Sequence, residues 1–265
     1  MPARYPERIV CLTEETTETL YLLGEERRIV GISGYTVRPP RARREKPRVS
    51  AFLSAKNDRI LELKPDLVLG FSDLQADILR DLAKAGLNVM VFNQRSVEEI
   101  LSMILMLSSL VGAAEKGGKL VEQLEENLAS VRRAAEKFQR KPKVYFEEWD
   151  QPMISGIRWV SELVEIAGGE DVFKDRSFSQ SAAGRIIAAP EEVIGKNPDV
   201  ILGSWCGKKF RPEKVAARPG WQAIPAVREN RLYEIKSSEI LQPGPAALTD
   251  GVRRIFEILS ASQAP

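Results

Sequence analysis

Three features of the sequence predict an α/β protein made of two similar lobes. Short β-rich runs alternate with amphipathic stretches along the chain, which is typical of α/β folds. Residues 57–70 and 190–203 resemble one another. Between these two segments, residues 113–140 have the pattern of one long helix with a single apolar stripe. A duplicated α/β unit with a helical connection accounts for all three features.

The first half of the chain alternates strands and helices up to residue 112. Strands are predicted at 8–12, 28–33, 66–70 and 87–92, where the runs are short and rich in Val, Ile and Leu. Helices are predicted at 17–24, 57–65, 73–86 and 96–112. Pro65 ends the second of these helices and Gly86 follows the third, as expected for helix termini.

The second half begins with the connecting helix and then returns to the same alternation. Apolar residues at helical spacing line the connecting helix at Leu120, Leu124, Leu128 and Val131. Strand-like and helical stretches follow at 143–149, 158–169, 190–198, 199–203 and 231–238. We therefore predict an N-terminal lobe over 1–112, a connecting helix over 113–140 and a C-terminal lobe over 141–265.

The internal repeat matches specific residues and not only hydrophobicity. Aligned without gaps, "NDRILELKPDLVLG" and "PEEVIGKNPDVILG" share four identities, at Pro65/Pro198, Asp66/Asp199, Leu69/Leu202 and Gly70/Gly203. The offset is 198 − 65 = 133 residues, half of the 265-residue chain. Alone, a short match of this kind also arises by chance, since similar helix-to-strand turns are common in α/β proteins. Together with the central helix it favours duplication.

Composition excludes several classes of function. With 39 basic and 37 acidic residues the net charge is +2, so we expect no nucleic-acid partner. We expect no membrane insertion either, because the most apolar stretch, from Ile100 to Ala114, is shorter than a bilayer span. Histidine is absent, which removes the usual general base and the commonest zinc ligand. The two cysteines, Cys11 and Cys206, form no metal-binding or disulfide motif.

Ligands of open parallel sheets bind beyond the carboxyl ends of the strands. The segments predicted there, which the repeat pairs as "FSDLQ" and "SWCGKKF", are rich in aromatic and basic side chains. Exposed aromatic surface is costly unless a ligand covers it, although each aromatic residue is about as often an ordinary core residue. The candidate ligand-binding residues are Tyr35, Arg38, Phe52, Phe71, Trp149, Arg158, Trp159, Trp205, Lys208 and Lys209, with Phe210 and Arg95 in the same segments.

The sequence resembles the class III substrate-binding proteins of ABC importers, in the cobalamin and ferric-siderophore branch, over nearly its whole length. The resemblance is carried by "RIVCLTEETTETLYLLGEERRIVGISGY", "RPPRARREKPRVSAF", "GGEDVFKD" and the two repeat segments. It implies two Rossmann-like lobes joined by a single long rigid helix. It also implies a substrate-binding protein like those that bind vitamin B12, which holds a corrinoid between its lobes and delivers it to an importer permease.

The resemblance further assigns individual residues. Tyr35 and Phe52 match the positions that contact the corrin ring, and Asp58 and Glu191 match the acids that dock onto transporter arginines. The segment 176–190 is longer than in the family, which leaves Phe178 as a weak candidate for a second corrin-facing aromatic. No signal peptide is visible, so the family's periplasmic location and a cytoplasmic location both stay open. We expect a monomer.

The ligand and two other functions stay open at this point. Arg38, Arg95, Arg158, Lys208 and Lys209 suit an anionic ferric siderophore, and haem is a further alternative, whereas the aromatics suit a corrinoid such as cobalamin or another metal chelate. The acid pairs Glu14/Glu15 and Glu147/Glu148 suit a hard cation, although acids at strand ends are more often solvated. We expect no catalytic cofactor and no metal site.

An enzyme would depend on Cys206, whose thiol pKa the lysines could lower, but no histidine is present as its base. The third functional hypothesis is a cytoplasmic ligand carrier or sensor that serves no importer.

Overall fold

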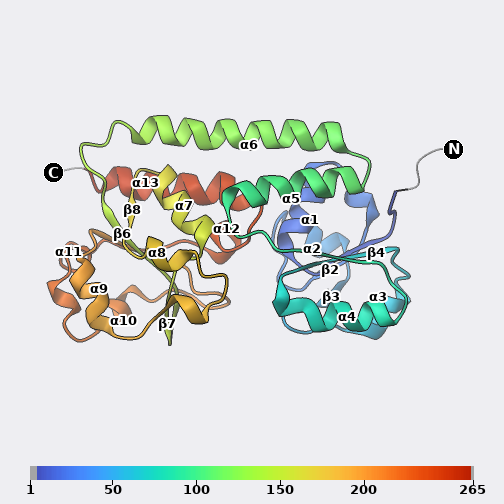
Figure 1. The fold of residues 1–265 in the computed structure, drawn as a ribbon, viewed down its shortest axis with the longest axis horizontal. Coiled ribbons are helices and arrows are strands. Elements are labelled where there is room, and N and C mark those ends of the chain that lie inside the picture. The colour runs from blue at the N-terminus through green and yellow to red at the C-terminus, as the bar shows by residue number, and fades with distance from the viewer. Residues whose placement is uncertain (1–4, 264–265) are drawn as a thin grey trace. The chain divides into compact units, whose positions relative to one another are not determined.

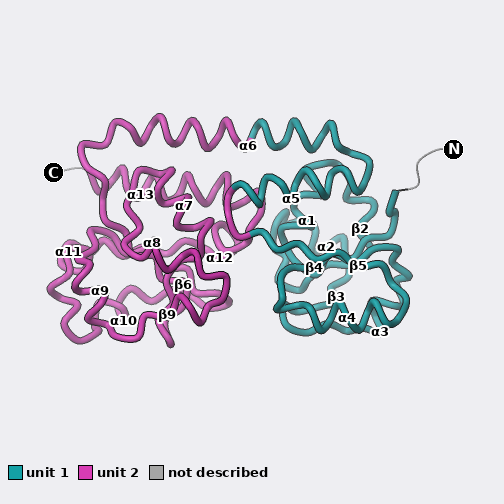
Figure 2. The backbone as a smooth tube through the Cα atoms, in the orientation of Figure 1, with its two compact units in different colours: residues 1–94, 98–123 teal, residues 95–97, 124–265 magenta. Residues whose placement is uncertain are grey.

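The structure is a computed structural model that describes residues 5–263. The chain divides into two compact units, coloured separately in Figure 2: unit 1 holds residues 1–94 and 98–123, and unit 2 holds residues 95–97 and 124–265. The division falls within the longest helix, α6 (Ala114–Ala135). No helix among residues 5–263 combines the length and hydropathy needed to cross a membrane.

Unit 1 is built on a five-stranded parallel sheet in the order β3-β2-β1-β4-β5. Its helices cover both faces, with α1 and α5 on one side and α3 and α4 on the other (Figure 1). The strands are β1 (Ile9–Cys11), β2 (Ile29–Ser33), β3 (Arg48–Ser50), β4 (Leu67–Phe71) and β5 (Val89–Phe92). The helices are α1 (Glu14–Leu22), α2 (Ala42–Glu45), α3 (Asn57–Glu62), α4 (Ala76–Lys84) and α5 (Val97–Leu110).

Unit 2 has a six-stranded mixed sheet in the order β11-β10-β6-β7-β9, with β8 also paired to β6. In Figure 1, α7 and α13 lie on one face and α9, α10 and α11 on the other. The strands are β6 (Lys143–Asp150), β7 (Met153–Ser155), β8 (Glu170–Asp171), β9 (Ile186–Ile187), β10 (Val200–Gly203) and β11 (Leu232–Glu234). The helices are α7 (Arg158–Ile166), α8 (Lys174–Ser177), α9 (Pro190–Lys196), α10 (Pro212–Ala216), α11 (Pro225–Arg228), α12 (Ser237–Ile240) and α13 (Val252–Ala261), the last preceded by a π-helical turn at Ala247–Gly251.

The predicted repeat corresponds to the same topology in both units. Strand β4 lies between β1 and β5, and β10 lies between β6 and β11, all in parallel pairs. Asp66 accepts a 2.9 Å hydrogen bond from the backbone N–H of Arg8, just before β1. Asp199 accepts a 2.8 Å hydrogen bond from the N–H of Lys143, at the start of β6. The shared aspartate therefore satisfies the same backbone donor in each unit.

The shared glycine of the repeat also has a common role. A Cβ at Gly70 would lie 2.6 Å from Leu79, and one at Gly203 would lie 2.0 Å from the ring of Phe210. Glycine is needed at both strand ends because a side chain of the following segment packs directly onto the backbone. In unit 2 that packing gives the Phe210 ring a T-shaped contact with Trp205 at 5.0 Å.

The predicted α/β class with two lobes and mostly parallel sheets is confirmed, and the differences are local. The long helix ends at Ala135 and not near residue 140, because the chain turns there and Phe138 stacks on Phe256 at 5.6 Å. The antiparallel pairing of β6 with β7 and of β7 with β9 was not predicted. Strands β7 and β9 are three and two residues long, too short to show a periodic pattern. The division at residues 112 and 140 stays a prediction.

Candidate functional site

The carboxyl ends of the strands in unit 1 carry a set of exposed apolar side chains. Tyr35 follows β2, Leu53 follows β3 and Leu74 follows β4, and their side chains are 60%, 68% and 57% exposed. Because the five strands are parallel, these three loops lie at one edge of the sheet. Phe52 is half-buried beside Leu53. This edge therefore exposes apolar surface to solvent.

Backbone hydrogen bonds hold the loop that carries Tyr35. The N–H of Tyr35 donates to Ser33 Oγ at 3.2 Å, and that of Thr36 donates to the Ser33 carbonyl at 3.2 Å. The N–H of Gly34 donates to the carbonyl of Ser50 at 2.7 Å, which joins this loop to the end of β3. Tyr35 is thus exposed on a well-fixed turn.

Gln75 fixes the neighbouring loops. Its side chain is fully buried, and its amide nitrogen donates to the carbonyl of Phe52 at 2.9 Å and to that of Leu12 at 3.4 Å. Its amide oxygen accepts a 2.9 Å hydrogen bond from the N–H of Phe71. One side chain therefore ties together the segments after β1, β3 and β4. Ser72, between Phe71 and Gln75, has a φ of +57°, a backbone conformation that non-glycine residues rarely adopt.

Acidic side chains of α1 fix the part of the loop after β2 that follows Tyr35. Arg38 Nε donates to Glu18 at 2.9 Å, and Glu14 Oε2 accepts a 3.0 Å hydrogen bond from the N–H of Val37. Burial raises the pKa of Glu14 to about 8, with further contributions from Glu18 and Glu15. Burial likewise raises the pKa of Glu15 to about 7. These acids are buried and not solvated, contrary to what acids at strand ends usually show.

At the corresponding edge of unit 2, Glu147 is the centre of a buried network. Its carboxylate accepts hydrogen bonds from Trp205 Nε1 at 3.0 Å, Tyr145 Oη at 2.9 Å and both terminal nitrogens of Arg218, at 2.5 and 2.9 Å. The Arg218 guanidinium lies 4.6 Å from the centre of the Trp221 ring. Trp205 is therefore a buried residue, 4% exposed, whose indole is committed to this network.

The next residue, Glu148, is half-buried and forms an ion pair with a buried arginine. Arg185, 2% exposed, donates to both carboxylate oxygens of Glu148, at 2.6 and 3.1 Å. Arg185 also donates to the carbonyl of Ser155 at 2.5 Å. Glu147 and Glu148, two of the four acids that the sequence offered to a hard cation, thus each bind an arginine.

The segment after β10 brings Lys208 onto an aromatic surface. Lys208 Nζ forms an ion pair with Asp150 and lies 4.1 Å from the ring centre of Trp149 and 5.0 Å from that of Trp205. Trp149 is half-buried, and its Nε1 donates to the carbonyl of Gln151 at 2.9 Å. Lys209 is exposed and lines a hollow of about 260 Å³ beside Arg211.

Helix α7 positions the remaining predicted residues of unit 2. Arg158 is half-buried, forms a 2.8 Å ion pair with Glu162 and lies 5.5 Å from the ring centre of Phe178. Phe178 itself is 58% exposed. Trp159, 4% exposed, donates from Nε1 to the carbonyl of Ile240 at 2.9 Å. Arg158 and Phe178 are accessible, and Trp159 belongs to the interior.

The ten predicted ligand-binding residues fall into three groups by exposure. Tyr35, Lys208 and Lys209 are exposed, and Arg38, Phe52, Trp149 and Arg158 are half-buried. Phe71, Trp159 and Trp205 are buried, as are Phe210 and Arg95. Sequence reasoning missed Leu53, Leu74 and Gln75. Leu74 and Gln75 stand in "FSDLQ", directly after the strand predicted at 66–70, and that position was the available signal. The strand before Leu53, β3, was not predicted.

The two predicted docking acids occupy equivalent positions. Asp58 is the second residue of α3 and Glu191 the second residue of α9, and both are exposed. Each helix leads into the matching central strand, β4 or β10. Within residues 5–263 neither carboxylate forms an ion pair. The neighbouring Glu192, in contrast, pairs with Arg176.

Cys206 lacks the environment of a reactive thiol. It is exposed, but partial burial of the sulfur, followed by the negative charge of Glu148, raises its pKa. The nearby Lys208 is paired with Asp150. A nucleophilic cysteine needs the opposite shift, so this geometry does not support the enzyme reading.

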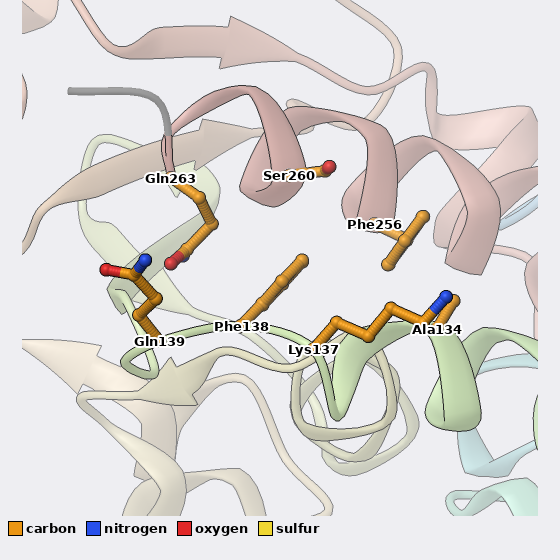
Figure 3. A pocket seen from close by; sticks show the side chains of 7 residues that line it. All are labelled: Ala134, Lys137, Phe138, Gln139, Phe256, Ser260 and Gln263. Carbon is orange, nitrogen blue, oxygen red and sulfur yellow. The ribbon is translucent and has the colours of Figure 1, made fainter.

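A separate groove in unit 2, shown in Figure 3, lies between the end of α6 and α13. Its volume is about 400 Å³, and the stacked rings of Phe138 and Phe256 line it. The groove contains Gln139, just before β6, and so lies toward the amino end of that strand. Ligands of parallel sheets bind at the opposite, carboxyl end.

Comparison with known proteins supports a binding function over more than nine-tenths of the chain. A Bacillus subtilis protein named an uncharacterized ABC transporter substrate-binding lipoprotein is 25% identical, with 95% of this chain and 79% of that protein aligned. The vitamin B12-binding protein of Vibrio parahaemolyticus is 27% identical, with 91% and 86% aligned. The periplasmic heme-binding protein of Roseiflexus sp. RS-1, solved in its apo form, is 25% identical with a TM-score of 0.80, over 96% of this chain and 99% of that one.

These similar proteins are binding proteins and not enzymes, in agreement with the placement of Cys206. They also agree with the resemblance seen in the sequence. Residues 9–239, which are most of the chain, match the family described as periplasmic binding protein. The protein therefore belongs to the periplasmic binding protein family, as a substrate-binding protein of the ABC import type.

Proposed function

We propose that this protein binds a corrinoid at the strand-end loops of its two units and delivers it to the permease of an ABC importer. The observation that carries the proposal is the exposed apolar set of Tyr35, Leu53 and Leu74 at one edge of unit 1. Covering an aromatic side chain of about 150–250 Å² contributes roughly 4–6 kcal/mol. A large ligand with apolar faces, such as a corrin ring, suits this surface. The name of the Vibrio parahaemolyticus relative supports the same ligand class.

In this proposal the exposed and half-buried residues contact the ligand, and the buried ones support them. Unit 1 contributes Tyr35, Phe52, Leu53 and Leu74. Unit 2 contributes the residues that are accessible at its own strand ends, namely Trp149, Arg158, Lys208, Lys209 and Phe178. Phe71, Trp159 and Trp205 then support these residues through the packing and hydrogen bonds described above. Arg38, although half-buried, is committed to its ion pair with Glu18 and supports the site in the same way.

Haem is the second candidate ligand, and Tyr35 favours it. A tyrosine side chain can ligate haem iron, and the 60% exposed ring of Tyr35 is accessible to a bound porphyrin. Exposed Lys209 and half-buried Arg158 offer positive charge for the carboxylates of haem. The Roseiflexus protein is named for haem binding, which supports this alternative.

We further propose that Asp58 and Glu191 dock the loaded protein onto arginines of its permease. The two acids are exposed at equivalent positions of the two units, and a pair of such contacts would orient the complex. An exposed ion pair contributes only about 0.2–1 kcal/mol, so these contacts would set orientation more than affinity. Docking of this kind requires export, and we propose a periplasmic or extracellular location on the basis of the family.

An absorbance titration distinguishes the ligands. Purified protein would be titrated with cobalamin, cobinamide, haem and a ferric siderophore, each of which has a visible spectrum that reports binding. The proposal expects saturable binding of a corrinoid, together with a rise in melting temperature as the ligand concentration exceeds Kd. Binding of haem alone, with a Tyr35→Phe variant that loses it, would favour the second candidate. The Phe138→Ala variant, in the groove of Figure 3, serves as the control for an unrelated surface.

A further inference from the structure

The guanidinium group of Arg158, the first residue of α7, is held at one nitrogen and uncommitted at the other two. Its Nε donates to Glu162 Oε1 at 2.8 Å. Its two terminal nitrogens form no hydrogen bond within residues 5–263, and 41% of the side chain is exposed. A guanidinium group offers paired N–H donors in a fixed plane, which match two oxygens of a carboxylate or phosphate group. Arg158 therefore presents a free pair of donors to solvent.

Glu162 is itself fixed, unlike the acid of an ordinary exposed ion pair on a helix. Its other carboxylate oxygen, Oε2, accepts a 2.7 Å hydrogen bond from the N–H of Val97. The carbonyl of Arg95, two residues earlier, accepts a 3.0 Å hydrogen bond from the N–H of Trp159. Residues 95–97 belong to unit 2, so these contacts join one backbone segment to the first two turns of α7. Because the carboxylate is bound on both sides, it restricts the position of the Arg158 Nε.

The aromatic ring of Phe178 lies against the same guanidinium group. Arg158 Cζ is 5.5 Å from the centre of that ring, within the range of a cation–π contact. Phe178 is 58% exposed. An anion bound by Arg158 would therefore lie beside an apolar surface that the rest of a ligand can cover.

The start of α7 lies at the carboxyl end of the parallel strands of unit 2. Ser155, the last residue of β7, pairs with Glu147, and Glu147 also pairs with Gly203, the last residue of β10. Only residues 156 and 157 separate Ser155 from Arg158. Arg158 therefore belongs to the edge of the sheet at which ligands of parallel sheets bind.

The acids of α7 leave the two terminal nitrogens available. Glu162 contacts the Nε, and Glu165, the other acid of this helix, forms a 2.7 Å ion pair with Lys174. Arg158 and Glu162 are neutral as a pair, so two directed N–H donors would bind an anion here more than net charge would. We expect such donors to favour an oxyanion over an uncharged group by about tenfold.

We propose that Arg158 and Phe178 form a subsite for an oxyanion of the ligand, and that Glu162 is the positioning residue that orients the Arg158 donors. The inference rests on the proposed function and deepens it, because it names the ligand group that unit 2 recognises. Among corrinoids, cobalamin carries such a group, the phosphodiester of its nucleotide loop, and cobinamide lacks it. Haem offers the same chemistry in its two carboxylates.

Cobalamin and cobinamide test the subsite in titrations of the full-length protein. Arg158→Gln keeps a polar side chain and removes the guanidinium group. It should raise the Kd for cobalamin about tenfold and leave the Kd for cobinamide within about twofold. Arg158→Lys keeps the positive charge without the paired donors, so its Kd for cobalamin should stay close to that of Arg158→Gln. A lysine variant that binds cobalamin like the wild type would overturn the assignment to paired donors.

The role of Glu162 is tested by its coupling to Arg158. Glu162→Gln keeps an acceptor for the N–H of Val97 but loses the carboxylate that holds the Nε. It should raise the Kd for cobalamin about threefold in the wild type and leave it unchanged in Arg158→Gln. Equal losses for cobalamin and cobinamide in both backgrounds would show a purely structural role and overturn the positioning role. Arg254→Gln, which breaks an exposed helical pair with Glu257, is the matched control and should change neither Kd.

The outcomes separate this inference from the proposed function. If both corrinoids bind and Arg158→Gln affects them equally, the oxyanion subsite is refuted and corrinoid binding stands. If haem binds and neither corrinoid does, the corrinoid proposal fails, and haem is then compared with its dimethyl ester, whose esterified carboxylates carry no charge. A loss of affinity for haem in Arg158→Gln, with binding of the ester unaffected, supports the subsite. An equal effect on haem and its ester refutes it.

Discussion

The side-chain amide of Gln75 donates a 2.9 Å hydrogen bond to the carbonyl oxygen of Phe52, two loops away at the same edge of the sheet. The same side chain accepts a hydrogen bond from the N–H of Phe71. A buried residue that fixes two of the predicted ligand-contact segments determines how rigid they are before any ligand arrives. Rigid loops bind more tightly because less conformational entropy is lost on binding.

We predict that Gln75→Leu loosens this edge. The substitution leaves the Phe52 carbonyl and the Phe71 N–H without their partner, which should lower the free energy of unfolding by about 1–3 kcal/mol. Hydrogen exchange at residues 51–55 should accelerate, and corrinoid affinity should fall several-fold. Gln75→Glu keeps the acceptor but loses the donor, so exchange should accelerate mainly around Phe52. Gln123→Leu, an exposed position on α6, is the control. Unchanged exchange in Gln75→Leu would contradict this role.

The buried ion pair of Glu147 and Arg218 predicts a large loss of stability when one partner is removed. Arg218→Met would leave the Glu147 carboxylate, 0% exposed, without its two guanidinium hydrogen bonds. Leaving a buried charge unpaired costs about 3–5 kcal/mol, measurable by urea unfolding. Lys119→Met breaks the exposed pair with Glu115 and should cost less than about 1 kcal/mol. Similar losses in the two variants would contradict the importance of the network.

The buried acids of α1 predict that stability falls as the pH rises from about 5 to about 8. The pKa of Glu14 is raised from 4.5 to about 8, so the folded protein holds a proton that the unfolded chain releases above pH 4.5. The stabilisation is complete below pH 4.5 and is lost as the pH approaches 8. Glu15, with a pKa of about 7, acts in the same direction. Melting temperature measured against pH reports this fall.

Glu14→Gln provides the control for the pH effect. A neutral amide cannot release a proton, so the variant should show a shallower fall and should exceed the wild type at pH 8 by a few kcal/mol. Glu115→Gln, at an exposed position of α6, should retain the wild-type profile. A profile that is identical in wild type and Glu14→Gln would show that this carboxyl does not titrate between these values.

Thiol labelling tests the prediction that Cys206 is not a reactive, catalytic thiol. Because its pKa is raised, only a small fraction is thiolate at pH 7, and iodoacetamide should react more slowly than with a free cysteine peptide. Cys11 is buried and its pKa is raised to about 12, so it should label only after unfolding. Mass spectrometry of the labelled peptides separates the two sites. Rapid reaction at Cys206 in the folded protein would support a catalytic role for this cysteine.

The repeat made the fold predictable. At the matched positions, Pro indicates the end of a helix, Asp a hydrogen-bond acceptor at the start of a strand, and Gly a close approach of a side chain to the backbone. Each residue has that physical role in both units. The pairing of β7 with β6 and β9 was not predictable, because register in short strands depends on long-range contacts.

The position of the candidate segments at strand ends was predictable, but the exposure of their side chains was not. Segment position identified the strand-end loops, yet composition does not tell an exposed tryptophan from a buried one. Trp205 was expected to face the ligand, and its burial depends on Glu147, 58 residues earlier in the chain. Leu74 was overlooked because an isolated leucine usually belongs to the core, whereas here it is 57% exposed beside a strained Ser72.

The docking acids give the last prediction. Reversal of both charges, in Asp58→Lys with Glu191→Lys, should leave the Kd for the ligand unchanged, because both carboxylates are exposed on helices outside the strand-end loops. Uptake by cells with the cognate importer should fall at least tenfold, since each acid–arginine attraction becomes a repulsion. Glu98→Lys, another exposed acid in the first turn of a helix, is the matched control and should transport normally. Equal uptake by the double variant and the control would exclude the docking role, and a single variant with an intermediate rate would show that the two units contribute separately.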